Sequence, residues 1–336
     1  ALCLCNWNLT SMTSTRAFAP ASIGNVSLGF DVLGAAIAPI DGTLLGDWVE
    51  VTNAEQFSLS QNGRFVHKLP SNQQENIVTA CYEYFQAALV SKGLLPLKVR
   101  LHLHKNLPIG SGLGSSAASI VAAFYALNAH SEKQLNRPAF SKDELLGMMG
   151  ELEGQISGSV HYDNVAPSYL GGMTLMTGEE SPIAIQLPVF DNWYWVSSYS
   201  GLSVSTAKAR ALLPKQYSLA DALVFGRQLA VFVDSLHTNN QALAAKMMKD
   251  VIAEQHRKVL LPEFDNARAF SEQNKALSFG ISGSGPTVFA VTQRLEDAQV
   301  IEQWLNKHYI QNHDGFSHIC KIDTAGTRVI TQIGNE

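Results

Sequence analysis

The segment 108–118 combines glycine and serine in a pattern that suits the binding of an anion. Gly110, Gly112 and Gly114 carry no side chains, so neighbouring backbone amides can converge on one anion. Ser115 follows at the predicted start of a helix, whose free N–H groups would point to the same place. The segment contains no lysine or arginine, which fits capture of a phosphate by backbone groups. A tight strand-to-helix turn without a ligand is the alternative interpretation.

The segment differs from three familiar phosphate-binding motifs. A Walker A loop needs Gly-x-x-x-x-Gly-Lys-Ser/Thr, but Ser115 stands where the second glycine should be, and no lysine follows it. A dinucleotide-binding fingerprint also needs a glycine at the position of Ser115. The chain lacks the Asp-Phe-Gly and His-Arg-Asp sequences of protein kinases. The pattern therefore indicates another class of phosphate site.

The composition narrows the class of protein. The 336 residues are 46% hydrophobic and 16% charged, with a formal net charge of −5, as in a globular protein of one large or two ordinary domains. A mildly acidic chain offers no basic surface, so we expect no nucleic acid and no membrane partner. The cysteines Cys3, Cys5, Cys81 and Cys320 lack metal-ligand spacing, and no apolar stretch is long enough to span a membrane. We therefore expect a cytoplasmic protein with reduced thiols.

Strand and helix patterns are mixed along the chain. Val99, Leu101 and Leu103 alternate with polar residues, which predicts a strand with one buried face. Ser141 and Glu144 have the spacing of a capping box at the start of a helix. We also predict helices at 77–92, 115–128, 141–153, 219–236, 241–252 and 296–309, and strands at 16–20, 193–198 and 287–291. The mixture predicts an α+β fold.

The polar, acidic stretch 177–182 is the best candidate for a domain boundary. We therefore predict an N-terminal domain over 12–175 and a C-terminal domain over 176–336. Residues 1–11 show no pattern before Met12, and we expect them to be a non-native or disordered leader without a role in the fold.

Three segments, in order along the chain, resemble the motifs of the GHMP kinases, the superfamily of galactokinase, homoserine kinase, mevalonate kinase and phosphomevalonate kinase. Segment 19–34 resembles the first motif in its homoserine-kinase form. Segment 108–118 resembles the second motif, and segment 281–287 the third. The segments 161–167, 204–210 and 254–257 are similar to sequences specific to homoserine kinases. The resemblance extends from about Arg16 to Arg328.

The resemblance implies a two-domain α+β fold, with a left-handed βαβ unit in the N-terminal domain and a ferredoxin-like C-terminal domain. It implies phosphorylation of L-homoserine by ATP, with Mg²⁺, as a step of threonine biosynthesis, and it allows a homodimer. A mevalonate-type kinase and a catalytically inactive sensor of the same fold stay open as alternatives. Asp31, as a partner for an ammonium group, favours homoserine over mevalonate. The presence of both implied magnesium ligands, Ser116 and Glu153, argues against an inactive protein.

The resemblance also implies which residues form the site. The ATP-binding residues would be Asn76, Pro108, Ile109, Gly110, Ser111, Gly112, Leu113, Gly114, Ser115, Ser116, Ala117 and Ala118. The substrate-binding residues would be Asn25, Asp31, His161, Asn164, Arg210, Arg257 and Gly283. The catalytic residues would be Asn164, Thr206 and Arg210. The magnesium ligands would be Ser116 and Glu153, with Glu151 as the second candidate for the carboxylate.

Asp163 and Asn164 resemble the position at which mevalonate-type relatives carry a catalytic aspartate. We expect an extended segment here, in which neighbouring side chains point in opposite directions. The resemblance to homoserine kinases then implies that Asn164 faces the substrate while Asp163 holds the loop. A loose transition state needs little prior deprotonation of the attacking hydroxyl, so no dedicated base is required.

Overall fold

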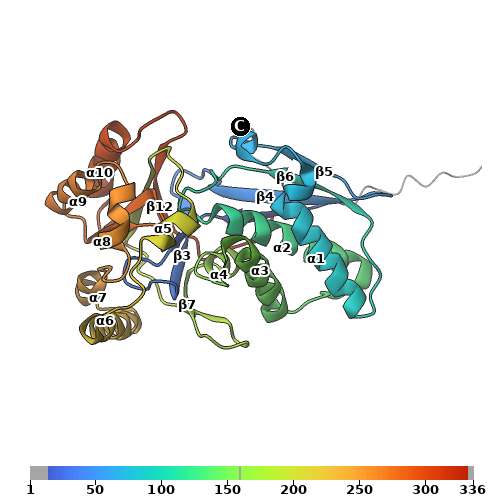
Figure 1. Ribbon diagram of the computed structural model, residues 1–336, viewed down its shortest axis with the longest axis horizontal. Helices are drawn as coiled ribbons and strands as arrows, with labels where there is room; N and C mark the ends of the chain where they lie inside the picture. The colour runs from blue at the N-terminus through green and yellow to red at the C-terminus, as the bar shows by residue number, and fades with distance from the viewer. Residues whose placement is uncertain (1–13, 159, 332–336) are drawn as a thin grey trace, which may run out of the picture.

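The computed structural model describes residues 14–158 and 160–331, which form two regions of mixed helices and strands (Figure 1). The N-terminal region contains a five-stranded sheet in the order β13-β1-β4-β6-β5. Its strands are β1 (Ser14–Pro20), β4 (Gly46–Asn53), β5 (Leu59–Asn62), β6 (Val99–His104) and β13 (Arg328–Val329). The helices of this region are α1 (Ile77–Ser91), α2 (Ser115–Leu135), α3 (Lys142–Ser157) and α4 (Val165–Leu170).

Helix α2 packs against strands β1 and β4 and carries the end of the glycine-rich segment. Its small residues, such as Ala117, Ala118 and Ala122, are fully buried, so the helix can lie close to the sheet. Strands β5 and β6 pair in parallel with α1 between them, which makes the βαβ unit that the resemblance implies. These contacts hold the start of α2 at the edge of the core that faces the other region (Figure 1).

A second sheet of eight strands runs through the C-terminal region. Its strands, in sheet order, are β10 (Ser278–Ile281), β11 (Thr287–Thr292), β9 (Tyr194–Tyr199), β12 (Phe316–Ile322), β3 (Leu33–Pro39), β7 (Met173–Met176) and β8 (Ala184–Leu187), with β2 (Ser22–Gly24) beside β3. The helices are α5 (Thr206–Ala211), α6 (Leu219–His237), α7 (Gln241–Met247), α8 (Glu254–Arg257), α9 (Phe264–Gln273) and α10 (Leu295–His308).

The order β10-β11-β9-β12 is antiparallel throughout, and the chain visits it as β9, α9, β10, β11, α10, β12, with the helices α5 to α8 between β9 and α9. This is the βαββαβ arrangement of a ferredoxin-like domain. The α+β prediction is therefore confirmed, and the C-terminal region has the ferredoxin-like arrangement that the resemblance implies. Three short 3-10 turns complete the described elements: Val66–Lys68, Gln73–Glu75 and Lys258–Leu260.

Most predicted elements agree with the structure to within a few residues. The capping box of Ser141 and Glu144 is present at the start of α3. Helix α2 continues to Leu135, beyond the predicted end at residue 128. Helix α7 ends at Met247, five residues before the predicted end at 252. The reason is Asp250, whose carboxylate accepts hydrogen bonds from the backbone amides of residues 252, 253 and 254 and so turns the chain into α8.

The second sheet crosses the predicted domain boundary. Position 175 lies inside β7, and β3 from the first part of the chain pairs with β12 from the last. In the other direction, β13 pairs with β1. The division at 175/176 stays a prediction, and the predicted leader 1–11 lies outside the described residues. Among those described, no helix has the length and apolar character needed to cross a membrane.

Candidate active site

A cavity of about 590 Å³ lies between the two regions and collects segments that are far apart in the sequence. Predicted site residues that line it are Asn25, Asp31, Asn76, Ile109, Gly110, Ser111, Gly112, Gly114, Ser115, Ser116, Glu153, His161, Asn164, Thr206, Arg210, Arg257 and Gly283. The other predicted residues, Pro108, Leu113, Ala117 and Ala118, are buried behind the loop. Their side chains do not line the cavity, and their assignment to the ATP site stays a prediction.

The glycine-rich loop has the backbone conformation that its sequence predicts. Gly112 and Gly114 have φ angles of +80° and +66°, in the left-handed region that favours glycine. A Cβ atom at residue 112 would lie 2.4 Å from the backbone oxygen of Ser282, which is too close for any side chain. Gly114 is also the N-cap residue of α2, so the loop delivers the chain directly into the helix start.

The third motif holds the glycine-rich loop in place from the C-terminal region. The Ser282 hydroxyl donates a hydrogen bond of 2.6 Å to the backbone oxygen of Gly112. The Thr287 hydroxyl donates one of the same length to the backbone oxygen of Ser111. The amide of Gly283 donates a hydrogen bond to the backbone oxygen of Gly24, which belongs to the first motif. All three motif segments therefore meet around one cavity.

Ser116 and Glu153 meet on one wall of the cavity. The Ser116 hydroxyl donates a 2.7 Å hydrogen bond to Oε1 of Glu153, and burial raises the pKa of that carboxyl. Two adjacent hard oxygen donors fit Mg²⁺, which prefers a few protein oxygens together with substrate phosphates and water. Among the described residues there is no cluster of three or more His, Cys, Asp or Glu side chains that could hold a metal ion. Glu151 is exposed and accepts a hydrogen bond from Tyr84.

Another part of the cavity wall carries charged side chains. Nη2 of Arg210 lies 2.9 Å from both carboxylate oxygens of Asp31, and each side chain is about one-third exposed. Arg257 is 3% exposed and donates a 2.9 Å hydrogen bond to the backbone oxygen of Gly283. The guanidinium groups of Arg210 and Arg257 lie 5.5 and 5.2 Å from the ring centroid of Phe30, respectively. Phe30 thus supports both cations, a role that the sequence did not predict.

Asn25 lines the cavity, but its amide group connects two loops. Its Oδ1 accepts a 2.9 Å hydrogen bond from the Asp31 amide, and its Nδ2 donates to the backbone oxygen of Gly283. Asn25, Val26, Ser27 and Asp31 all have positive φ angles, between +47° and +69°. Several strained residues in one short loop are typical of a functional site. Asn25 is therefore placed to hold Asp31 in position.

The expected arrangement of Asp163 and Asn164 is wrong in one respect. The chain turns at these residues instead of running extended, so both side chains line the cavity. Nδ2 of Asn164 lies 3.2 Å from Oδ2 of Asp163, and Oδ1 of Asn164 accepts a 2.9 Å hydrogen bond from Ser22. Burial, reinforced by the nearby charge of Asp31, raises the pKa of Asp163 to about 7.

Three further predicted residues occupy different parts of the wall. His161 lies near Asp31, Arg210 and Glu153, and burial lowers the pKa of its imidazole. Thr206 is exposed at the first residue of α5. Asn76 is 1% exposed and caps α1 through a 2.9 Å hydrogen bond from the Val78 amide to its Oδ1.

Comparison with known proteins agrees with this geometry. The family model described as GHMP kinases N terminal domain matches residues 76–172, and the GHMP kinases C terminal model matches residues 232–311. The crystal structure of a homoserine kinase from Cytophaga hutchinsonii is 33% identical, with a TM-score of 0.82 over 97% of this chain and 100% of that one. The chain belongs to the GHMP kinases. It is therefore a member of a phosphotransferase family that uses ATP as co-substrate.

Two more distant structures share the GHMP kinase fold. A putative homoserine kinase from Listeria monocytogenes is 22% identical, with a TM-score of 0.67 over 95% of this chain and 100% of that one. The mevalonate kinase of Methanococcus jannaschii is 14% identical, with a TM-score of 0.64 over 94% of this chain and 99% of that one. Because members with different acceptors share the fold, the fold alone does not identify the acceptor of this GHMP kinase.

Apart from Asn76, the sequence did not predict the apolar part of the cavity wall. Apolar side chains gather there from the segment before α1, from α1 and from α3: Leu69, Pro70, Ile77, Ala80 and Leu152. A nucleotide base has two apolar faces, so this end of the cavity suits the base of ATP. Lys105 and Ser119 also line the wall behind the loop. None of these residues belongs to a motif, and only the fold brings them together.

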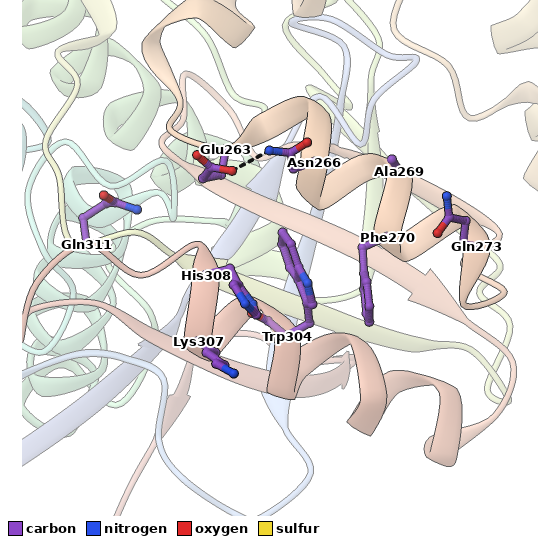
Figure 2. A pocket seen from close by; sticks show the side chains of 9 residues that line it. All are labelled: Glu263, Asn266, Ala269, Phe270, Gln273, Trp304, Lys307, His308 and Gln311. Atoms are coloured by element: carbon purple, nitrogen blue, oxygen red, sulfur yellow. Dashed lines mark hydrogen bonds between the residues drawn. The ribbon is translucent and has the colours of Figure 1, made fainter.

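A second hollow, of about 640 Å³, lies between α9 and α10 on the outer side of the C-terminal region (Figure 2). Phe270, Trp304 and His308 stack in series there, with centroid separations of 5.0 and 4.6 Å. Both faces of the Trp304 ring are thus already covered by protein. The described lining of this hollow includes no predicted site residue, so we place the active site in the cavity between the two regions.

Proposed function

We propose that this GHMP kinase transfers the γ-phosphoryl group of ATP to the hydroxyl of L-homoserine. The observation that carries the proposal is the Asp31–Arg210 pair, with Arg257 beside it, on the wall of the cavity. Homoserine carries one ammonium and one carboxylate group. A carboxylate next to two guanidinium groups offers a partner for each of them.

Binding of a zwitterion would exchange partners within this group of charges. In the structure, Asp31 and Arg210 neutralise each other. A zwitterionic substrate can give Asp31 an ammonium and give Arg210 and Arg257 a carboxylate, so that no charge in the pocket is left unpaired. Mevalonate has a carboxylate but no ammonium, so it would leave Asp31 without a substrate partner. This difference supports homoserine over a mevalonate-type acceptor.

The transfer itself needs alignment and charge stabilisation. The hydroxyl oxygen of homoserine attacks the γ-phosphorus, the bond from that phosphorus to the bridging oxygen breaks, and ADP leaves. The backbone amides of the glycine-rich loop and the start of α2 would hold the phosphates. Bound Mg²⁺, for which Ser116 and Glu153 are the candidate ligands, would neutralise phosphate charge. In a loose transition state the hydroxyl proton can pass to the transferred phosphoryl group, so Asn164 and Thr206 need only orient the hydroxyl.

A panel of acceptors tests the proposal. We expect ADP release from ATP and Mg²⁺ with L-homoserine, and a product with the mass of O-phosphohomoserine. R-Mevalonate and galactose should give no comparable turnover. 4-Hydroxybutyrate, which lacks only the ammonium group, should lose kcat/KM by roughly 10²-fold or more, because Asp31 is left unpaired. Efficient turnover of 4-hydroxybutyrate or mevalonate, without turnover of homoserine, would contradict the proposal.

A further inference from the structure

A buried ion pair lies directly beneath the glycine-rich loop. Lys105 is 1% exposed and Asp47 is fully buried, and Nζ of Lys105 lies 2.5 Å from Oδ2 of Asp47. The same ammonium donates hydrogen bonds of 2.9 Å to the backbone oxygen of Ser115 and 2.8 Å to the hydroxyl of Ser119. A lysine ammonium has three N–H groups, and here each of them has an acceptor. Lys105 is therefore held in one position.

Asp47 connects both ends of the loop. Its Oδ1 accepts hydrogen bonds of 2.8 and 2.9 Å from the amides of Asn106 and Leu107, just before the loop begins. Its Oδ2 accepts from Lys105 and from the Ser119 hydroxyl, on the first turns of α2 just after the loop ends. One carboxylate from strand β4 thus sets the distance between the two ends of the loop.

The two members of the ion pair differ in their position relative to the cavity. Lys105 and Ser119 line the active-site cavity, whereas Asp47 does not. The positive end of the pair therefore faces the cavity, behind the start of α2, whose own N-terminus is positive. Charge separation in a dry interior acts strongly over short distances. A buried ion pair is also costly compared with apolar residues of the same size, so packing alone gives little reason to keep one at this wall.

We propose that Lys105 is a positioning residue for the phosphates of the nucleotide. Together with Asp47 it fixes the geometry of the glycine-rich loop, and its ammonium adds positive potential behind the amides that receive the phosphates. The inference rests on the nucleotide site of the proposed function and is independent of the acceptor. It also revises the expectation of capture by backbone groups alone, because a lysine outside the motif supports them.

Binding of ADP and of adenosine separates this role from a structural one. Lys105→Met keeps most of the side-chain volume but leaves Asp47 charged in the interior, so this variant is at risk of not folding. The double variant Lys105→Met/Asp47→Asn removes both charges and keeps an amide oxygen for the backbone amides of Asn106 and Leu107. Lys92→Met, which removes a half-exposed ion pair with Glu144, is the control. Calorimetry gives the Kd of each ligand, and circular dichroism reports folding.

We expect the double variant to bind adenosine as the wild type does and to bind ADP about tenfold or more weakly. Its KM for the acceptor should stay unchanged, and the control should bind both ligands normally. A folded double variant with wild-type affinity for ADP would overturn the inference, and so would an equal loss for adenosine. Wild-type protein that binds ADP but does not phosphorylate homoserine would contradict the proposed function while leaving this inference intact.

Discussion

The two ends of the active-site cavity are built from different materials. The phosphate end is mainly backbone, a glycine-rich loop whose positive φ angles and close contacts leave room for no side chain. The proposed acceptor end is a set of ionisable side chains from separate segments, Asp31, Asp163, Arg210 and Arg257. A backbone site recognises what all nucleotides share, whereas a side-chain site can be changed residue by residue. The difference explains how one fold serves several acceptors.

The largest loss of activity is expected for Glu153→Gln, which changes a side chain at the phosphate end. Glu153→Gln is nearly isosteric but replaces a hard anionic ligand for Mg²⁺ with a neutral amide. We expect kcat to fall by about 10³-fold at ordinary Mg²⁺ with any acceptor, because the lost metal-assisted charge stabilisation amounts to several kcal/mol. The melting temperature should not fall. Glu151→Gln, on the exposed face of the same helix, is the control. Normal turnover in Glu153→Gln would place the ligand elsewhere.

At the acceptor end, Arg257→Leu should weaken binding of the acceptor and leave binding of ATP unchanged. Truncating one partner of a buried charge pair costs about 2–5 kcal/mol, so KM for homoserine should rise on the order of 10²-fold. KM for ATP should change little. Arg257→Lys should recover only part of the loss, because a lysine cannot form the two parallel hydrogen bonds of a guanidinium. An equal rise in KM for ATP would show that the two ends are not independent.

Gly112→Ala tests the claim that the phosphate end depends on backbone geometry. A methyl group there would lie 2.4 Å from the backbone oxygen of Ser282. The alanine would also have to adopt a φ angle near +80°, which is unfavourable for any residue with a side chain. Strain of about 1–3 kcal/mol and displacement of the loop should lower kcat/KM roughly 10–100-fold. Gly42→Ala shares the positive φ angle, at +86°, but its Cβ meets nothing within 4 Å. Equal kinetic losses in both variants would argue against the contact with Ser282.

Phe30→Leu should have a smaller effect, confined to the acceptor end. The ring lies under the guanidinium groups of both Arg210 and Arg257, and such cation–π contacts contribute about 0.5–2 kcal/mol. We expect KM for homoserine to rise by about three- to tenfold, with kcat and KM for ATP near wild type. Phe30→Tyr keeps an aromatic face and should restore most of the affinity. A loss in Phe30→Tyr as large as that in Phe30→Leu would exclude the cation–π explanation.

The smallest kinetic effect is expected for Asp163→Asn. If alignment and electrostatics carry the reaction, folded variant protein should keep kcat within about tenfold of wild type, below the 10²–10⁴-fold typical for loss of a general base. Kinetics with homoserine and ATP measure this directly. Because a pKa near 7 would also suit a base, a loss above about a thousandfold with unchanged KM would restore Asp163 as the base.

The same substitution should show a pH-dependent gain in stability. Burial and Asp31 raise the pKa of Asp163 from 3.8 to about 7, although Arg210 and Arg257 oppose the shift. Between those pH values the unfolded chain has released a proton that the folded protein still holds, so this group lowers the free energy of unfolding as the pH rises. The free energy of unfolding of Asp163→Asn minus that of the wild type should therefore be larger at pH 8 than at pH 4, by up to a few kcal/mol. Denaturant titrations at both pH values would measure the difference.

Local patterns predicted much of the fold. The alternation of Val99, Leu101 and Leu103 predicted β6, and the spacing of Ser141 and Glu144 predicted the start of α3. These features depend on neighbours within one strand or one turn, which the sequence contains. The sequence did not predict how β3 joins the C-terminal sheet, because its partner β12 lies far along the chain and pairing of strands leaves no local pattern.

The site shows the same division. The glycine-rich segment by itself determined that a backbone anion site was to be expected, and the resemblance of the three motifs to those of the GHMP kinases implied kinase chemistry. Only the tertiary structure decided that Arg210 meets Asp31 across 179 positions, that Phe30 lies under two arginines, and that Asp163 and Asn164 share one cavity. It also brought Lys105, which stands outside every motif, beneath the loop. Conformational preferences depend on residues that are neighbours in the sequence and can therefore be predicted from it. Charge pairing and burial depend on which distant segments the fold brings into contact.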